Sequence, residues 1–203
     1  MSKPKTQTFF TSDLHIGHHK VLEYCSRPFG SLHEMEEKLI ANWNSVVRPD
    51  DTVYVLGDFL LGGKPERIRE VIGRLNGLKI LIRGNHDAEG SRMKALGFDV
   101  VLDHAVMKIA GEQVNLSHFP YRMNRLKELY YEWGYKLFPK RFFRPRKFYW
   151  QLKNDGKFLL HGHTHSKHKI RGKMIHVGVD AWDFKPVSIG HIGNIIELIK
   201  RGK

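Results

Sequence analysis

Short apolar runs that stop at a glycine or a polar residue recur through the first half of the chain. Runs of this kind are typical of strands that are buried on both faces of a sheet. They predict strands over Gln7–Ser12, Val53–Leu56 and Lys79–Ile82. Between these runs, apolar residues recur with the period of an amphipathic helix instead.

Two helices are predicted between the strands. The first begins at Ser31, which is placed to form a capping box with Glu34. The second begins at Pro65, because proline is common in the first turn of a helix. Strands that alternate with helices indicate βαβ units and a largely parallel sheet, whose ligands bind beyond the carboxyl ends of the strands.

The second half of the chain predicts shorter strands and one last helix. Its apolar runs cover Val100–Ile109, Gln113–Ser117, Phe158–His161 and Met174–Val179. Ser188 is placed to cap a final helix that is marked by isoleucines at helical spacing. Without an internal repeat or a low-complexity tract, the pattern predicts a single domain over residues 1–203.

A basic, aromatic insert at about 122–157 interrupts this pattern. It interleaves arginines and lysines with tyrosines, phenylalanines and tryptophans, and it holds few acidic residues. Positive charge and stacking platforms are what a groove for single-stranded nucleic acid needs. The alternative is a helical hairpin whose aromatic residues pack onto the body, and a membrane-surface role is a weaker third option. We expect part of the aromatic set to pack, while residues 141–147 stay available.

The formal net charge of +13 favours polyanionic partners. No stretch approaches the roughly 18 apolar residues of a membrane span, and no membrane association is expected. The N-terminal residues do not have the pattern of a signal peptide. The single cysteine, Cys25, excludes an intramolecular disulfide and fits a reducing compartment, so a cytoplasmic location is expected. Cys25 itself is interpreted as a packed residue.

Metal-ligating residue types follow the predicted strands in turn. In chain order they are Asp13 and His15, Asp58, Asn85 and His86, His118, and His163 and His165. Carboxylate oxygens and imidazole nitrogens are common ligands of divalent transition metals. Two cations held close together need a bridging carboxylate, and Asp58 on a central strand is the natural bridge.

The motifs Asp-x-His, Gly-Asp, Gly-Asn-His-Asp, a lone His and Gly-His-x-His, in this order, resemble the metallophosphoesterase (calcineurin-like phosphoesterase) superfamily. The resemblance runs from about residue 9 to residue 180, and the stretches 117–120 and 177–182 look like its short prokaryotic and phage-type members. It implies an α/β fold, a four-layer α/β/β/α sandwich of two mixed β-sheets flanked by helices. A binuclear metal site would lie at the strand ends.

The resemblance also implies a role for each motif. One metal would be bound by Asp13, His15, Asp58 and His165, and the other by Asp58, Asn85, His118 and His163. His86 would be the catalytic histidine, and together with Asn85 it would stabilise charge on phosphorus and protonate the leaving oxygen. Because His118 and His163 flank the insert, the insert would lie at the rim of the site.

The segment after Asp58 departs from the protein Ser/Thr phosphatases of this superfamily. Those enzymes follow Gly-Asp with an acidic residue and an arginine that grips phosphate, and residues 59–63 contain neither. A protein phosphatase is therefore disfavoured. The carboxylate partner of the catalytic histidine is also missing from this position, and Asp87 is a candidate replacement.

The remaining histidines are interpreted as surface or packing residues. They are His18, His19, His33, His104, His168, His176 and His191. His161 lies just outside the Gly-His-x-His motif and would at most support a ligand.

The sequence thus predicts a two-metal phosphodiesterase that hydrolyses a nucleic-acid or nucleotide phosphoester with a metal-bridging hydroxide. A small-molecule phosphomonoesterase is the alternative, followed by a non-catalytic nucleic-acid-binding module on the same fold. Mn²⁺ is favoured, although Fe, Zn and Ni also suit the ligands. The candidate substrate-binding residues are Arg83, Arg122, Arg141, Arg144, Arg146 and Lys147.

Overall fold

The computed structural model describes residues 5–122, 136–137 and 151–202. Among these residues the strands form two five-stranded sheets. The first sheet has the order β10-β1-β2-β3-β4, with β10 antiparallel to β1 and the other neighbours parallel. Its strands are β1 (Thr8–Thr11), β2 (Thr52–Val55), β3 (Leu78–Ile82), β4 (Val100–Leu102) and β10 (Val187–Ser188).

The second sheet has the order β5-β6-β7-β9-β8. Strands β6, β7 and β9 are parallel to one another, while β5 and β8 run antiparallel at the two edges. Its strands are β5 (Ala105–Ile109), β6 (Glu112–Leu116), β7 (Phe158–His161), β8 (Ile170–Arg171) and β9 (Met174–His176).

Successive side chains of the first sheet enter two different hydrophobic clusters, because they point to opposite faces of a strand. Phe9, Val55 and Leu81 belong to a cluster with the apolar faces of two helices. Their immediate neighbours Phe10, Leu56 and Ile82 belong to a second cluster, which includes apolar residues of β6, β7 and β9. The first sheet is therefore buried on both faces, and the second sheet covers one of them.

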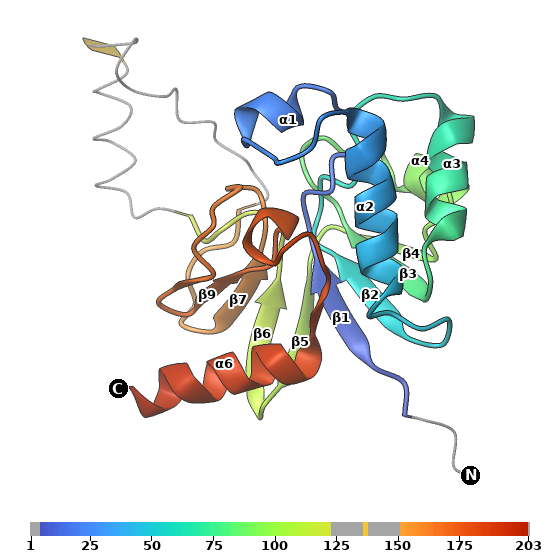
Figure 1. The fold of residues 1–203 in the computed structure, drawn as a ribbon. Coiled ribbons are helices and arrows are strands. Elements are labelled where there is room, and N and C mark those ends of the chain that lie inside the picture. The colour runs from blue at the N-terminus through green and yellow to red at the C-terminus, as the bar shows by residue number, and fades with distance from the viewer. Residues whose placement is uncertain (1–4, 123–135, 138–150, 203) are drawn as a thin grey trace.

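Helices flank the two sheets. The described helices are α1 (Val21–Tyr24), α2 (Leu32–Asn44), α3 (Pro65–Arg74), α4 (Gly90–Ala95) and α6 (Ile189–Arg201), with a 3₁₀ turn at Val179–Ala181. In Figure 1, α2 and α3 stand beside the first sheet, and α6 passes below β5 and β6. This arrangement of two mixed sheets flanked by helices confirms the predicted fold class.

Most of the predicted elements are confirmed, and their caps explain where they begin. The hydroxyl of Ser31 accepts the N–H of Glu34 at the start of α2, and that of Ser188 accepts the N–H of His191 at the start of α6. The Glu34 carboxylate accepts the N–H of Gly30, not that of Ser31, so the capping box is only half formed. Pro65 is the first residue of α3, as predicted.

Two strands and two short helices differ from the prediction. The single strand expected over Val100–Ile109 is two strands, because the chain leaves the first sheet after β4 and enters the second with β5. The strand expected over Met174–Val179 ends at His176, before the 3₁₀ turn. The short helices α1 and α4 were not predicted, since neither is long enough to show an amphipathic period.

The parallel strands decide where the polar motifs meet. Asp13, Asp58 and Asn85 follow β1, β2 and β3, while His118 and His163 follow β6 and β7. The carboxyl ends of parallel strands lie at one edge of a sheet, so the chain brings all of these motifs to one edge of the sandwich. Among the described residues, no helix combines the length and the apolar character needed to cross a bilayer.

Candidate metal centre

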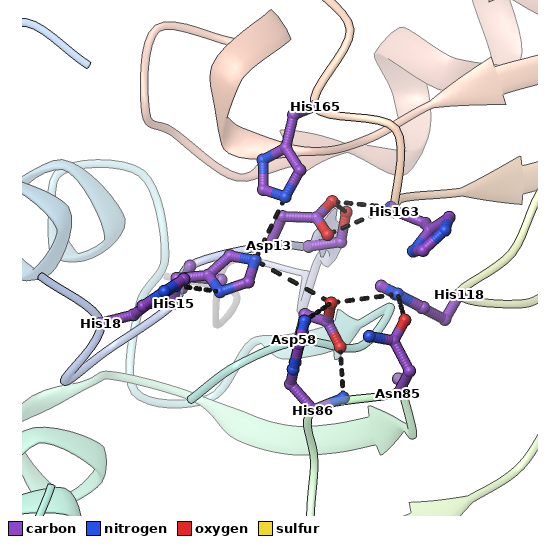
Figure 2. A network of polar contacts seen from close by, with 12 residues as sticks. Asp13, His15, His18, Asp58, Asn85, His86, His118, His163 and His165 are labelled. Atoms are coloured by element: carbon purple, nitrogen blue, oxygen red, sulfur yellow. Dashed lines mark hydrogen bonds and ion pairs between the residues drawn. The ribbon is translucent and has the colours of Figure 1, made fainter. Parts of the chain in front are cut away.

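Two groups of side chains that could hold a metal ion lie side by side at this edge (Figure 2). The first consists of Asp13, His15 and His165, and the second of Asp58, His118 and His163. Within each group the potential ligand atoms lie within 4.8 Å of one another. The motif residues are therefore gathered as the sequence predicts.

Asp58 lies between the two groups. Its Oδ2 is 3.3 Å from Nε2 of His118 in the second group and 3.9 Å from Nε2 of His15 in the first. Asn85 adds a further oxygen to the second group, since its Oδ1 is 3.2 Å from Nε2 of His118. The placement of Asp58 suits a carboxylate shared by two cations.

The backbone is strained where these side chains are attached. Positive φ angles are found at Asp13, His15, Asp58, His163 and His165, with values of 59°, 56°, 50°, 69° and 49°. Residues other than glycine adopt such angles only when the surrounding structure imposes them, and this strain is concentrated at functional sites. The strain at these five residues lowers the stability of the fold, and the same backbone conformations direct the five side chains into one cluster.

Two glycines let the loops approach the carboxylates closely. A Cβ atom on Gly84 would lie 2.2 Å from Oδ1 of Asp58, and one on Gly162 would lie 2.5 Å from Oδ2 of Asp13. Both distances are far below van der Waals contact, so any side chain at either position would push the carboxylate aside. The motifs therefore need glycine here for space.

Hydrogen bonds donated by Nδ1 orient two of the imidazoles. Nδ1 of His118 donates to the carbonyl oxygen of Leu56 at 2.8 Å, and Nδ1 of His165 donates to Oδ2 of Asp180 at 2.9 Å. A proton held on Nδ1 leaves Nε2 free to bind a metal, and such partners are usual behind ligating histidines. In both rings Nε2 is the atom directed into the cluster.

Arg27 anchors the first group from behind. Its guanidinium pairs with both carboxylate oxygens of Asp180 at 2.8 and 2.9 Å, and it donates to the carbonyl oxygens of Asp13 and Leu14. Arg27 is 5% exposed, so these contacts are made away from water. The sequence analysis missed Arg27, because its partner Asp180 is 153 residues away and no local motif marks the pair.

Burial and the neighbouring charges set the protonation of the cluster. Burial raises the pKa of Asp13 and lowers the pKa of His15 to about 3 and that of His163 to about 4. Burial also disfavours the ionised carboxylate of Asp58, but its hydrogen bonds and charge interactions with His118 and His86 together outweigh burial and lower its pKa. His15 and His163 are therefore neutral rings beside a carboxylate that stays ionised.

The cluster favours positive charge. Burial disfavours an imidazolium, yet the interactions of His165 with Asp180, Cys25 and Asp13 together raise its pKa to about 10. Contacts with Asp58 and Asp13 likewise raise the pKa of His118. Ionised carboxylate, amide oxygen and neutral imidazole are a donor set that suits divalent transition metals. The residues present fit two such cations, whose binding would release protons from these histidines.

His86 lies at the open side of the cluster. Its side chain is 34% exposed, and its Nε2 is 3.9 Å from Oδ2 of Asp58. The backbone N–H of His86 donates to Oδ1 of the same carboxylate at 3.0 Å. A group that enters the cluster from solvent would therefore pass beside this imidazole.

The prediction that Asp87 partners His86 is wrong. The carboxylate of Asp87 accepts the backbone N–H groups of Asp58, Phe59 and Gly84 at 2.8 to 3.0 Å. Burial raises the pKa of Asp87 to about 6. Asp87 therefore stabilises the loop that carries Asp58, and its carboxylate is directed at that loop and not at His86.

His18 is also placed differently from its prediction as a surface or packing residue. Its Nδ1 is 3.2 Å from Nδ1 of His15, and the two rings are 5.2 Å apart (Figure 2). His18 is half-buried, and it borders the first metal-binding group. A lone histidine after a Gly carries no sequence signal for such a contact.

The candidate substrate-binding residues are only partly within the described structure. Arg83 is paired with Asp103, with 2.8 Å between Nε and Oδ1. Arg122 is exposed, and its backbone N–H donates to the carbonyl oxygen of Leu152 at 2.9 Å. The others, Arg141, Arg144, Arg146 and Lys147, lie outside the described residues, as does most of the insert.

Comparison with known proteins decides the family. Residues 7–167 match the family model of calcineurin-like phosphoesterases. The chain belongs to this family. The match covers all five motifs and both halves of the candidate metal centre, so these phosphoesterase motifs are the ones that the fold brings together.

Relatives of similar length support the assignment. The phosphoesterase is 32% identical to an uncharacterized protein of Methanocaldococcus jannaschii over 96% of this chain and 92% of that protein. It is 35% identical to the gene 66 protein of Mycobacterium phage L5, over 87% of this chain and 88% of that one. A crystal structure of a protein of unknown function from Aquifex aeolicus has the same fold, with a TM-score of 0.65 at 24% identity, covering 94% of this chain and 100% of that one.

Family membership and the two ligand groups together indicate metal-dependent phosphoester hydrolysis. The deciding observation in the structure is the placement of Asp58 between two sets of imidazole and carboxylate ligands.

Asp180→Asn is expected to lose stability in a pH-dependent way. Burial disfavours the ionised carboxylate of Asp180 in the wild type, but hydrogen bonds from His165 and Arg27 and their charges outweigh burial and lower the pKa of Asp180 to about 2. Because this pKa is lower in the folded than in the unfolded chain, the ionised carboxylate stabilises the fold above about pH 4 and loses this effect as the pH falls toward 2. The stabilisation corresponds to about 2 kcal/mol at neutral pH and roughly half of that at pH 3.

Urea unfolding of both proteins in EDTA at pH 3, 4.5 and 6 measures this difference. The gap between wild type and Asp180→Asn should narrow toward low pH. A gap that is constant over this range would mean that the ionisation of Asp180 does not contribute.

Proposed function

We propose that this phosphoesterase hydrolyses phosphodiesters of nucleic acid or nucleotides with two divalent transition-metal ions, Mn²⁺ being favoured over Fe, Zn and Ni. The observation that carries the proposal is the pair of ligand groups that meet at Asp58. One cation would be held by Asp13, His15, Asp58 and His165, and the other by Asp58, Asn85, His118 and His163. When bound, two such cations supply Lewis acidity toward phosphoryl oxygens and activate water at neutral pH.

Residues of the chain supply the remaining groups. His86 would give a proton to the leaving oxygen, since its partly exposed ring borders the cluster. Asn85 would stabilise the charge that develops on the phosphoryl oxygens through its amide N–H₂, because its oxygen faces His118. The hydrogen bond that His165 donates to Asp180 would keep the His165 ring in its orientation throughout.

The surroundings of the cluster support a diester over a monoester. A phosphate monoester carries close to two negative charges at neutral pH, and proteins commonly meet such groups with arginine forks. Arg27 is committed to Asp180 and to backbone carbonyls, and Arg83 is paired with Asp103. The residues after Asp58 are apolar, and Phe59 is fully buried. A phosphodiester carries a single negative charge, so its binding needs fewer arginine side chains at the site.

Charge supports a polyanionic substrate. The chain has a formal net charge of +13, and its basic insert is joined to the body next to His118 and His163. An excess of positive charge raises the local concentration of nucleic acid and accelerates its association.

His86→Ala is expected to lower kcat by roughly 10²- to 10⁴-fold, the range typical of a lost general acid. Metal content should remain that of the wild type, because the backbone N–H that bonds to Asp58 is retained. Turnover of an aryl phosphodiester together with elemental analysis separates the two effects. His33→Ala is a matched control, because His33 is an exposed histidine on α2 and belongs to neither candidate ligand group. Undiminished turnover in His86→Ala would contradict the role of this histidine.

A substrate panel with Mn²⁺ supplied tests the reaction class. We expect higher kcat/KM for aryl phosphodiesters than for the matching monoesters, and hydrolysis of DNA, RNA or a cyclic nucleotide. A preference for monoesters would instead support a small-molecule phosphatase. Saturable nucleic-acid binding without any turnover would support a binding module.

Neutralising the basic insert is expected to weaken nucleic-acid binding and to flatten its salt dependence. The combined change of Arg141, Arg144, Arg146 and Lys147 to glutamine removes up to four phosphate contacts, and each contact contributes a slope of about 0.9 in log K against log salt. Fluorescence anisotropy at several salt concentrations measures this slope. An unchanged slope would mean that these residues do not meet phosphate.

A further inference from the structure

A pocket of about 410 Å³ lies on the other side of the loop that carries His163 and His165. Thr164 and Ser166 line the pocket, whereas the two histidines that alternate with them belong to the candidate metal centre. One short loop therefore forms a wall of both sites. The volume is within the range of pockets that bind small organic ligands, about 300 to 1,000 Å³.

The walls of the pocket combine apolar surface with positive charge. Pro120, Ile170 and Met174 supply the apolar part. Lys169 and Arg171 line it as well, and no aspartate or glutamate is among the described lining residues. An anionic ligand with a flat apolar body has the complementary chemistry.

His176 supplies hydrogen-bonding groups that have no partner. His176 is among the residues that line the pocket and is 2% exposed, and neither ring nitrogen is hydrogen-bonded to a described residue. Burial lowers the pKa of His176 to about 3, so the ring is neutral and offers one donor and one acceptor. Leaving such groups unsatisfied is costly, and a ligand or water must relieve that cost.

The unpartnered imidazole discriminates between classes of ligand. Ionised phosphate oxygens accept hydrogen bonds and do not donate, so the ionised oxygens of a phosphate group would meet only the N–H of His176. A nucleobase edge carries both donors and acceptors, and its faces suit the apolar walls. The phosphate of the same nucleotide suits Lys169 and Arg171.

We propose that this pocket binds a nucleotide unit, with its base against Pro120, Ile170 and Met174 and its phosphate at Lys169 and Arg171. The proposal rests on the proposed function in one respect: the unit is the nucleotide adjoining the scissile phosphoester, held across the loop from the metals. A free nucleotide and the end of a strand share this chemistry. The substrate class then has at least two phosphates, which favours oligonucleotides over cyclic mononucleotides.

Binding of AMP, ribose 5-phosphate and inorganic phosphate tests the pocket. Isothermal titration uses the full-length protein with Mn²⁺ and again in EDTA, where the metals cannot supply affinity. AMP should bind at least about tenfold more tightly than the other two probes in EDTA, because they lack the base. If the natural ligand is the end of a strand, a dinucleotide should bind more tightly than AMP in Mn²⁺. If the natural ligand is a free nucleotide, the two should bind equally tightly.

Two variants and one control locate the binding. Arg171→Glu on exposed β8 and His176→Phe should each weaken AMP binding roughly tenfold, because each removes a polar partner of the ligand. Lys108→Glu, an equal change of charge on exposed β5, should leave binding and turnover unchanged. Thermal unfolding checks each variant, and Arg171→Glu keeps the test valid even if His176→Phe does not fold.

The outcomes separate the two proposals. Variant-sensitive AMP binding in a protein that hydrolyses no phosphodiester would support the pocket and overturn the proposed function. Phosphodiester hydrolysis by a protein that binds AMP no better than phosphate in EDTA would overturn the pocket, which would then hold only water. AMP binding that is indifferent to Arg171→Glu and His176→Phe would overturn it as well.

Discussion

Asp58→Asn is expected to abolish hydrolysis of an aryl phosphodiester and to empty both halves of the metal centre. The carboxylate lies between the two ligand groups, with Oδ2 3.3 Å from Nε2 of His118 and 3.9 Å from Nε2 of His15. Asparagine keeps the oxygen that accepts the N–H of His86 but removes the negative charge. The loss should exceed about a hundredfold, since even the partner of a metal ligand is commonly worth 10- to 100-fold.

Turnover and bound Mn²⁺, measured on the same samples, check this prediction. Asp50→Asn is the control, because Asp50 is an exposed aspartate in the turn before β2, at the opposite end of that strand from Asp58. Wild-type turnover with a full complement of metal in Asp58→Asn would overturn the assignment of Asp58 as the shared ligand. Retained fold with lost metal is the expected pattern.

Arg27→Met is expected to destabilise the protein by about 3 to 5 kcal/mol, the usual cost of breaking a buried ion pair from one side. Methionine has similar length and no charge, so it leaves the Asp180 carboxylate and the carbonyl oxygens of Asp13 and Leu14 without their donor. Metal affinity should fall as well, because Asp180 orients His165 and Arg27 holds the backbone of Asp13.

Urea unfolding in EDTA measures the loss of stability, and Mn²⁺ titration measures the loss of affinity. Arg74→Met is the matched control: Arg74 makes an equally close pair with Glu37, but both side chains are more than a third exposed. Exposed pairs contribute at most about 1 kcal/mol. If both variants lost the same stability, the buried setting of Arg27 would not matter. In a double-mutant cycle, Arg27→Met with Asp180→Asn should cost less than the sum of the single changes.

The sequence alone predicts which candidate ligands come together, because each lies within a few residues after a strand. A buried strand ends abruptly, and the next two or three residues are confined to the same edge of the sheet. Asp13, Asp58 and His118 could therefore be assigned to one site from chain order and parallel topology. The pattern was less informative where the chain changes sheets, as at residues 103–104, since an apolar run does not show which sheet it joins.

Contacts between distant parts of the chain could not be predicted. Asp87 was a candidate partner of His86, the residue before it in sequence, yet its carboxylate turns back to the loop of Asp58. His18 was expected to be peripheral, and tertiary packing places it against His15. Neither relation depends on spacing along the chain.

The amino-acid sequence by itself determined the family, the order of the strands and helices, and which residues are brought to the metal centre. These follow from local rules, because hydrophobic period defines each element and the ligand types sit at element ends. Only the tertiary structure decided how those ligands are held: the strained backbone, the Arg27–Asp180 pair, and the pocket across the loop from His163 and His165. Each of these joins segments far apart in the chain, so only the packed fold brings their atoms within reach.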